Sequence, residues 1–149
     1  MNKIVVVLLS ILLISGCALN QNDNKVRMYL DDIYYNKGEF VKVNSEKVND
    51  LSGNYVLFTY NSYCNFSVPC DEIFKSYMEK YNIDFLSISI DDFKNTYLYD
   101  TVKYAPSVII VSDKKIIGYL DANSDEDLER YTNTKSFEKW MDDYIYFKK

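Results

Sequence analysis

The feature that most constrains the fold is a strand, a short turn with two cysteines and a helix in direct succession. Residues 55–60 form a continuous apolar run, which is typical of a strand covered on both faces of a sheet. Cys64 and Cys70 follow, and from Ile73 to Tyr81 apolar residues recur at helical spacing. A thiolate at such a turn faces the positive end of the helix dipole, which is one way in which proteins make sulfur reactive. The pattern therefore predicts part of a fold and a candidate redox site together.

The N-terminus has the pattern of an export signal. Lys3 is followed by an apolar run over residues 4–14, which is shorter than the roughly 20 residues that a membrane span needs. Residues 14–17, Ile-Ser-Gly-Cys, resemble the lipobox of bacterial lipoproteins, in which the cysteine is lipid-modified and becomes the first residue of the mature chain. This resemblance implies a lipoprotein signal peptide at 1–16 and lipidation at Cys17. The alternative is an ordinary signal peptide with a chance cysteine.

The remaining length and the charge favour one anchored domain. Residues 17–25 are polar and without periodicity, as in a tether, and residues 26–149 have the length of a single domain. The net charge is −5, and no basic cluster is present to bind nucleic acid or anionic lipid. We therefore expect the chain at the cell membrane, on its extracytoplasmic face, held there by a lipid anchor.

The absence of histidine removes several chemistries. The chain contains no histidine, so Ser-His-Asp catalysis, Cys-His catalysis and histidine-ligated metal sites are excluded. If Cys17 is acylated, Cys64 and Cys70 are the two remaining thiols, which cannot complete a zinc site by themselves. Outside the cytoplasm, such an even remainder is consistent with a disulfide. We expect neither a metal nor a cofactor.

Periodicity predicts the remaining elements. An apolar stripe at Val26, Tyr29, Leu30 and Ile33 predicts an extra N-terminal helix, whereas residues 121–125 are expected to form a solvated acidic loop. The other expected elements are a strand at 39–44, a short helix from Ser45, the strand at 55–60, the helix from Cys70, a strand at 84–90, a helix through 93–102, a hairpin of 107–111 and 116–120, and a final helix with Phe137, Trp140, Met141, Tyr144 and Ile145 on its buried face.

This order of elements, with a cysteine pair after the second strand, resembles the thioredoxin fold. The turn at Tyr63 and Cys64 is similar to the one that precedes the redox site of thioredoxins, and Pro69-Cys70 is similar to the Pro-Cys that enters the next helix. Residues 104–107, Tyr-Ala-Pro-Ser, resemble the loop whose cis-proline faces the cysteines. The resemblance implies an α/β fold in which a mixed sheet of about four to five strands is flanked by helices.

The chain also departs from the thioredoxin pattern. Five residues separate Cys64 from Cys70, where the family has two. Alignment on Cys64 fits the strand spacing, whereas alignment on Cys70 places Ser67 where the attacking cysteine would stand. Phe58 occupies the position of the buried acid that assists proton transfer in many thioredoxins. The acidic Asp71 and Glu72 in the first helical turn suit the dipole but disfavour a neighbouring thiolate.

The resemblance implies thiol-disulfide exchange with exported proteins. Cys64 would attack or be attacked, Cys70 would resolve the mixed disulfide, and Tyr63, Ala105 and Pro106 would line the groove for a substrate chain. A membrane redox partner fits this activity. Small thioredoxin-like lipoproteins of bacteria, including those similar to bacteriocin transport accessory proteins, are the relatives that the chain resembles.

Two other functions remain open at this stage. The first is a non-catalytic thioredoxin-like accessory or binding lipoprotein, in which a Cys64–Cys70 disulfide only braces the fold. Closing a loop of this length stabilises a folded chain by roughly 2.4 kcal/mol, so such a disulfide is useful without catalysis. The second is a surface lipoprotein without a redox role.

Overall fold

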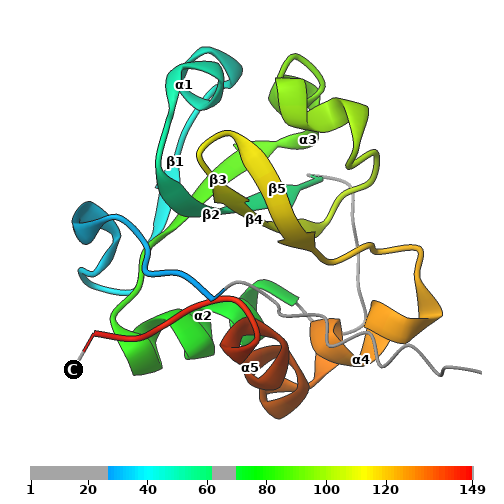
Figure 1. Ribbon diagram of the computed structural model, residues 1–149. Coiled ribbons are helices and arrows are strands. Elements are labelled where there is room, and N and C mark those ends of the chain that lie inside the picture. Colours follow the sequence, from blue (N-terminus) through cyan, green and yellow to red (C-terminus); the bar gives the residue numbers. More distant parts are fainter. Residues whose placement is uncertain (1–26, 62–69, 149) are drawn as a thin grey trace, which may run out of the picture.

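A five-stranded mixed sheet forms the centre of the computed structural model, which describes residues 27–61 and 70–148 (Figure 1). The strand order is β1-β3-β2-β4-β5, in which β1, β3 and β2 are parallel whereas β4 is antiparallel to both β2 and β5. The predicted central strand is confirmed, because β2 lies in the middle of the sheet. The strands are β1 (Phe40–Lys42), β2 (Asn54–Tyr60), β3 (Phe85–Ser89), β4 (Ser107–Ser112) and β5 (Lys115–Tyr119).

Helices cover both faces of the sheet. In Figure 1, α1 and α3 lie above the sheet, whereas α2, α4 and α5 lie below it. None of the helices within 27–61 and 70–148 is long and apolar enough to cross a membrane. The helices are α1 (Ser45–Asp50), α2 (Cys70–Tyr81), α3 (Ile90–Phe93), α4 (Asp125–Thr132) and α5 (Thr134–Asp142), with the 3-10 turns η1 (Asp32–Tyr34) and η2 (Tyr97–Asp100).

The predicted helix from Cys70 is confirmed as α2, and its apolar face is fixed by aromatic packing. Phe74, Tyr77 and Met78 are fully buried. The ring of Phe74 lies 4.6 Å from that of Phe137 on α5, and the ring of Tyr77 lies 5.2 Å from the same residue. Burial of each such side chain contributes roughly 1.5–3 kcal/mol, so this packing holds the start of α2 in a defined place.

The predicted hairpin is also confirmed, and it positions the loop that precedes it. Asp113 and Lys114 connect β4 to β5 with φ angles of 46° and 65°. Two left-handed residues in succession are the geometry of the tight hairpin turn that matches the twist of antiparallel strands. Ala105 and Pro106 directly precede β4, and β4 pairs with β2. The hairpin therefore fixes the position of the end of this loop.

The extra N-terminal helix is wrong for most of its expected length and is present only as the single turn η1. Met28 and Leu30 are buried while Tyr29 is 52% exposed and Ile33 is 73% exposed, so burial before η1 alternates as in a strand. Backbone hydrogen bonds explain this conformation, because the Met28 amide donates to Tyr144 at 2.8 Å and the Tyr146 amide donates to Met28 at 2.8 Å. These bonds with the C-terminal segment satisfy the backbone amide and carbonyl groups of Met28, which in a helix would be satisfied by other residues of the same helix.

The predicted acidic loop is confirmed except at its last residue, and two helix predictions are corrected. Asp125 begins α4, a helix that the apolar pattern did not indicate. The expected helix through 93–102 is divided into α3 and η2. The final helix α5 ends at Asp142, so Tyr144 and Ile145 lie beyond it, although Ile145 is still fully buried.

Candidate redox site

Cys70 is the first residue of α2 and is 6% exposed. The helix begins there and carries the acidic Asp71 and Glu72 in its first turn, both exposed to solvent. The helix dipole favours negative charge at this end, whereas the two carboxylates oppose a thiolate beside them. The Cys70 sulfur is therefore buried at the start of a helix, where the helix dipole favours a thiolate and the two carboxylates disfavour it.

The residue at the position of the expected acid is an aromatic side chain in an aromatic cluster. Phe58, on β2, is 6% exposed, and its ring lies 5.4 Å from that of Phe74 and 5.1 Å from that of Phe40. A carboxylate at this position would lose its water without gaining a polar partner from these rings. The sequence indicated that position 58 holds no general base, and the apolar side chains around Phe58 agree with this.

The loop at Ala105 and Pro106 has the geometry that the resemblance implied. The Ala105–Pro106 peptide bond is cis, Ala105 is half-buried and Pro106 is buried. The following residue, Ser107, is fixed to β2 because its backbone amide donates to Oγ1 of Thr59 at 3.0 Å. Tyr104, on the other side of the loop, is 54% exposed. The loop therefore combines a fixed buried end with an exposed aromatic side chain.

Tyr131, on α4, joins this loop to α2. Its hydroxyl donates a hydrogen bond of 2.9 Å to the carbonyl oxygen of Pro106, and its ring lies 5.9 Å from that of Phe74. Burial raises the pKa of Tyr131 far above its usual range, and a hydrogen bond with the Ser107 side chain opposes this rise to a smaller extent. Tyr131 therefore connects the loop at Pro106 with α2, the helix that begins at Cys70.

Sequence reasoning found two of these three residues. Cys70 lies at the start of α2, and Ala105 and Pro106 lie in the cis-proline loop before β4, whereas Tyr63, Cys64 and Cys17 lie outside the described residues. Tyr131 was missed because no helix was predicted over residues 125–132. The acidic first turn at residues 125–127, which follows Ser124, is a helix-start signal that indicates α4.

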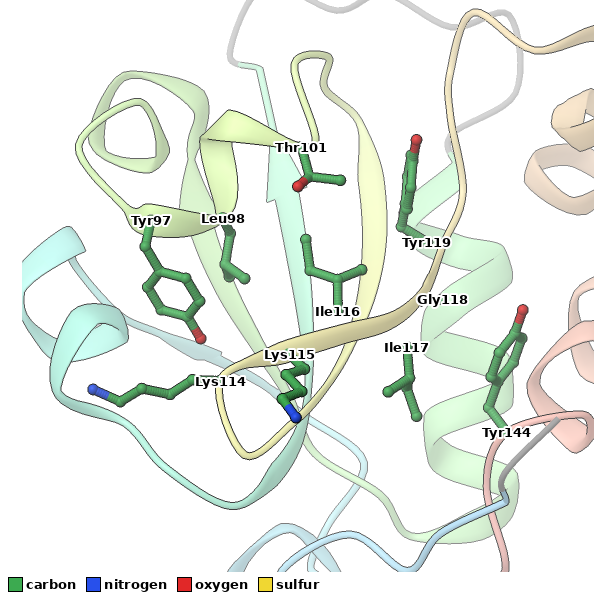
Figure 2. Close-up of a pocket in the computed structure, with 10 residues that line it drawn as sticks. All are labelled: Tyr97, Leu98, Thr101, Lys114, Lys115, Ile116, Ile117, Gly118, Tyr119 and Tyr144. Carbon is green, nitrogen blue, oxygen red and sulfur yellow. The ribbon is translucent and has the colours of Figure 1, made fainter.

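Two pockets lie near the hairpin. A small one of about 50 Å³ is lined by residues that include Tyr104, Tyr119 and Asp121. A larger one of about 570 Å³ runs along β5 between η2 and Tyr144, and Figure 2 shows its ten lining residues. The lining of the larger pocket includes two lysines and three tyrosines but neither Cys70 nor Pro106. It is therefore a groove of the sheet edge, separate from the candidate redox site.

Metal ligands do not gather in the described part of the chain. Among residues 27–61 and 70–148, no three acidic or cysteine side chains lie close enough together to hold a metal ion. The acidic Asp127 is instead used structurally, since it accepts a hydrogen bond of 2.9 Å from the Asp121 amide and pairs with Arg130.

Comparison with known proteins gives the fold. No family model matches the chain, and no curated protein does. Among solved structures, a point mutant of a thioredoxin from Halobacterium salinarum is 14% identical and covers 76% of this chain and 97% of its own, with a TM-score of 0.50. Mitochondrial thioredoxin 3 from Saccharomyces cerevisiae is 16% identical, covers 70% of this chain and 94% of its own, and has a TM-score of 0.48. A cysteine-to-serine mutant of a thioredoxin from Entamoeba histolytica is also 16% identical, with coverages of 64% and 98% and a TM-score of 0.45.

Proposed function

We propose that this chain, which has a thioredoxin-like fold, is a thiol-disulfide oxidoreductase that uses Cys64 and Cys70 on exported proteins. The observation that carries the proposal is the placement of Cys70 at the buried start of α2, a helix that Tyr131 connects to the cis-proline loop through its contact with Phe74 and its hydrogen bond to Pro106. A partly enclosed sulfur at a helix start, beside a loop that a second chain can approach, suits thiol-disulfide exchange.

The reaction follows from the two sulfurs. In the reducing direction, the Cys64 thiolate attacks one sulfur of a substrate disulfide, which forms a mixed disulfide and releases one substrate thiolate. The Cys70 thiolate then attacks the Cys64 sulfur, which forms the Cys64–Cys70 bond and releases the second substrate thiolate. Two electrons pass from the pair to the substrate, and the two cysteine protons end on the substrate thiols. The reverse sequence oxidises a dithiol.

The loop before β4 supplies the substrate surface in this proposal. Ala105 is half-buried, so part of its backbone is accessible for strand-like pairing with a substrate chain. The side chain of Tyr104 is 54% exposed and offers apolar contact beside that backbone. In the proposal Tyr63, which lies outside the described residues, also contributes to the groove. A substrate chain would be recognised mainly through its backbone, which suits a protein that acts on several exported proteins.

The proposed location is the extracytoplasmic face of the cell membrane, and it rests on the N-terminal sequence. The lipobox-like residues 14–17 favour a mature chain that begins at a lipid-modified Cys17. The proposal accordingly assigns the protein to the small bacterial thioredoxin-like lipoproteins, similar to bacteriocin transport accessory proteins, with a membrane redox partner to renew its dithiol or disulfide. Intact-mass analysis of the mature chain tests the anchor. A mass that includes acyl chains on Cys17 is expected, and a mature chain with an unmodified Cys17 would contradict it.

A turnover assay tests the activity. The wild type is expected to accelerate the reduction of a disulfide-bonded peptide by dithiothreitol, and Cys64→Ser and Cys70→Ser are each expected to abolish this acceleration. Glu79→Gln is the control, because it changes an exposed side chain farther along the same helix while both sulfurs remain. A wild type that gives no acceleration over the uncatalysed rate, with a disulfide that resists reduction, would overturn the proposal.

One observation favours a second candidate function. Phe58 stands in an aromatic cluster where a proton-transferring acid would be expected, which suits a non-catalytic accessory or binding protein with a structural Cys64–Cys70 disulfide. In that case removal of the disulfide would lower the free energy of unfolding by roughly 2–4 kcal/mol without any loss of turnover, since there would be none to lose. The turnover assay and an unfolding curve of Cys64→Ser together distinguish the two candidates.

A further inference from the structure

The groove along β5 has walls that are held in place from inside the molecule (Figure 2). On one side, the Tyr97 hydroxyl shares a hydrogen bond of 3.2 Å with the hydroxyl of Tyr55, a fully buried residue. On the other side, the Tyr144 ring lies 5.4 Å from that of Trp140 and so close to Gly118 that a Cβ there would be 2.6 Å from Cζ of the tyrosine. The groove, of about 570 Å³, is therefore formed before any ligand binds, as binding sites usually are.

The base of the groove is an edge strand with unused backbone groups. In the part of the chain that the structure describes, β5 pairs with β4 and with no other strand. The Leu120 amide donates to the Val108 carbonyl at 2.9 Å. Because backbone groups of successive residues in an antiparallel strand point to alternate sides, the amide and carbonyl of Tyr119 point away from β4. Such an edge can accept another extended chain by backbone pairing.

Apolar side chains lie on both sides of this edge. Figure 2 shows Ile116 and Ile117 pointing to opposite sides of β5, with Leu98 on the side of Ile116 and Tyr144 on the side of Ile117. The side chains of an extended segment alternate in the same way. A segment beside β5 would therefore place apolar side chains against both sides of the strand.

The charge of the groove differs from that of the rest of the protein. Among the described residues, those that line the groove include Lys114 and Lys115 and no acidic side chain, although the whole chain has a net charge of −5. Both lysines lie where β5 begins. The Lys114 ammonium donates to the Asn49 carbonyl at 3.0 Å, which fixes its position and leaves two of its hydrogens for a ligand. This end of the groove is suited to a carboxylate.

The same features select against other strands. Lysines and bulges on an edge strand oppose pairing with unrelated chains, and the register between β4 and β5 shifts between Ile110 and Val111. The β5 strand of a second copy, residues 115–119, brings no acidic side chain to the lysines. A matching strand must bring its own negative charge.

We propose that this groove binds an extended acidic segment of a partner protein, which pairs antiparallel with β5 and places its carboxylates beside Lys114 and Lys115. In an antiparallel pair, the C-terminal end of the segment lies where β5 begins, so the acidic residues are expected at that end. The inference goes beyond the proposed redox function and does not depend on it, since neither Cys70 nor Pro106 lines the groove.

A synthetic peptide tests the proposal. The probe has an acetylated N-terminus, five alternating valine and threonine residues to match the five of β5, two glutamates and an amidated C-terminus. Titration into the isotope-labelled full-length protein is expected to shift amide NMR signals of β5, Tyr97 and Tyr144. Lys115→Glu is expected to weaken binding about tenfold, because it places like charges together. Lys135→Glu is the matched control, since this exposed lysine on α5 does not line the groove, and it is expected to leave binding unchanged.

Two variants of the peptide separate its charge from its backbone. Glutamine in place of both glutamates is expected to weaken binding about tenfold. N-methylation of the backbone amides that would face β5 keeps every side chain but removes the donors for strand pairing, so it is expected to abolish binding.

Several results would overturn the proposal. One is the absence of signal shifts along β5, and another is equal weakening by Lys115→Glu and Lys135→Glu, which would indicate a general effect of charge. Binding of the N-methylated peptide as tight as that of the probe would exclude strand pairing. Self-association of the protein without peptide, measured by analytical ultracentrifugation and abolished by Lys115→Glu, would assign the groove to a second copy instead.

Discussion

The Tyr131 hydroxyl donates a hydrogen bond of 2.9 Å to the carbonyl oxygen of Pro106, 25 residues earlier in the chain. This bond connects α4 to the loop that precedes β4, and the Tyr131 ring extends the connection to α2 through Phe74. The start of α2 and the proline loop are therefore held together from a third element. The integrity of the candidate redox site depends on a helix that takes no part in the sulfur chemistry.

The first prediction concerns the stability that this bond supplies. Tyr131→Phe leaves a buried carbonyl without its donor, so we expect the free energy of unfolding to fall by roughly 1–3 kcal/mol. Urea unfolding followed by circular dichroism measures this change. Tyr77→Phe is the matched control, because the Tyr77 hydroxyl is buried without a hydrogen-bond partner in the described part of the chain, and its removal is expected to leave stability unchanged or to increase it. Equal losses in the two variants would contradict the account.

Asp84 gives a second prediction, at the opposite end of the sheet from the candidate site. Its carboxylate is 4% exposed and accepts hydrogen bonds from the Glu39 amide at 2.8 Å, the Lys37 amide at 3.2 Å and Nδ2 of Asn36 at 3.0 Å. Asp84→Ala leaves these donors unsatisfied, so we expect a loss of roughly 2–4 kcal/mol in the free energy of unfolding. The exposed Asp71→Ala serves as the control, and a loss within about 0.5 kcal/mol for Asp84→Ala would be inconsistent with a structural role.

Asp142 gives a prediction about pH. Burial raises the pKa of this carboxyl above its ordinary value of 3.8, and the nearby charge of Glu138 raises it further. The folded state therefore binds the proton more tightly than the unfolded state does, so the contribution of Asp142 to stability is greatest below pH 3.8 and is lost as the pH rises through the folded-state pKa. We expect Asp142→Asn to be more stable than the wild type at pH 7.

The difference between the Asp142→Asn and wild-type unfolding curves, measured across pH 3 to 8, isolates this group. The pKa of Glu138 is lowered by its hydrogen bond to Lys80, so its own contribution has the opposite sign and is lost as the pH falls. That contribution is common to both proteins and cancels to first order in the comparison. Asp143→Asn is the neighbouring control. A variant that is less stable than the wild type at pH 7 would refute the assignment.

The close approach of Tyr144 to β5 gives a prediction for the groove in Figure 2. A Cβ on Gly118 would lie 2.6 Å from Cζ of Tyr144, which is too close for two carbon atoms. Gly118→Ala is therefore expected to displace the Tyr144 ring and to cost roughly 1–3 kcal/mol of stability. The same substitution in a Tyr144→Ala background is expected to cost less, since the ring is absent. Additive losses in this double-mutant cycle would show that the two residues do not interact.

The central part of the fold follows from the sequence because its signals are local and strong. Residues 55–60 have no polar interruption beyond Thr59, and the apolar positions of α2 recur at helical spacing over three turns. The hairpin has a short turn between two apolar runs. Such patterns specify an element without help from distant residues, and they also place Cys70 at the start of a helix and Pro106 before a strand.

The missed elements depend on distant partners or weak patterns. The stripe at Tyr29, Leu30 and Ile33 suits a helix, but the hydrogen bonds of Met28 with the C-terminal segment favour an extended backbone, and no local signal reveals that partner. In α4, Leu128 is 51% exposed and Tyr131 supplies the buried apolar contact, so no stripe forms. A site residue on a helix with one buried aromatic side chain cannot be recognised from periodicity alone.

Trapping of the mixed disulfide tests the central claim most directly. In Cys70→Ser the resolving sulfur is absent, so we expect Cys64 to remain bonded to a disulfide-containing peptide, and mass spectrometry of the adduct identifies the bond. In Cys64→Ser we expect no comparable adduct at Cys70, which is 6% exposed at the start of α2. Accumulation of the Cys64 adduct in Cys70→Ser alone is the predicted result. Failure of Cys70→Ser to form an adduct, under conditions in which a small thiol does so, or an equal adduct at Cys70 in Cys64→Ser, would contradict the account.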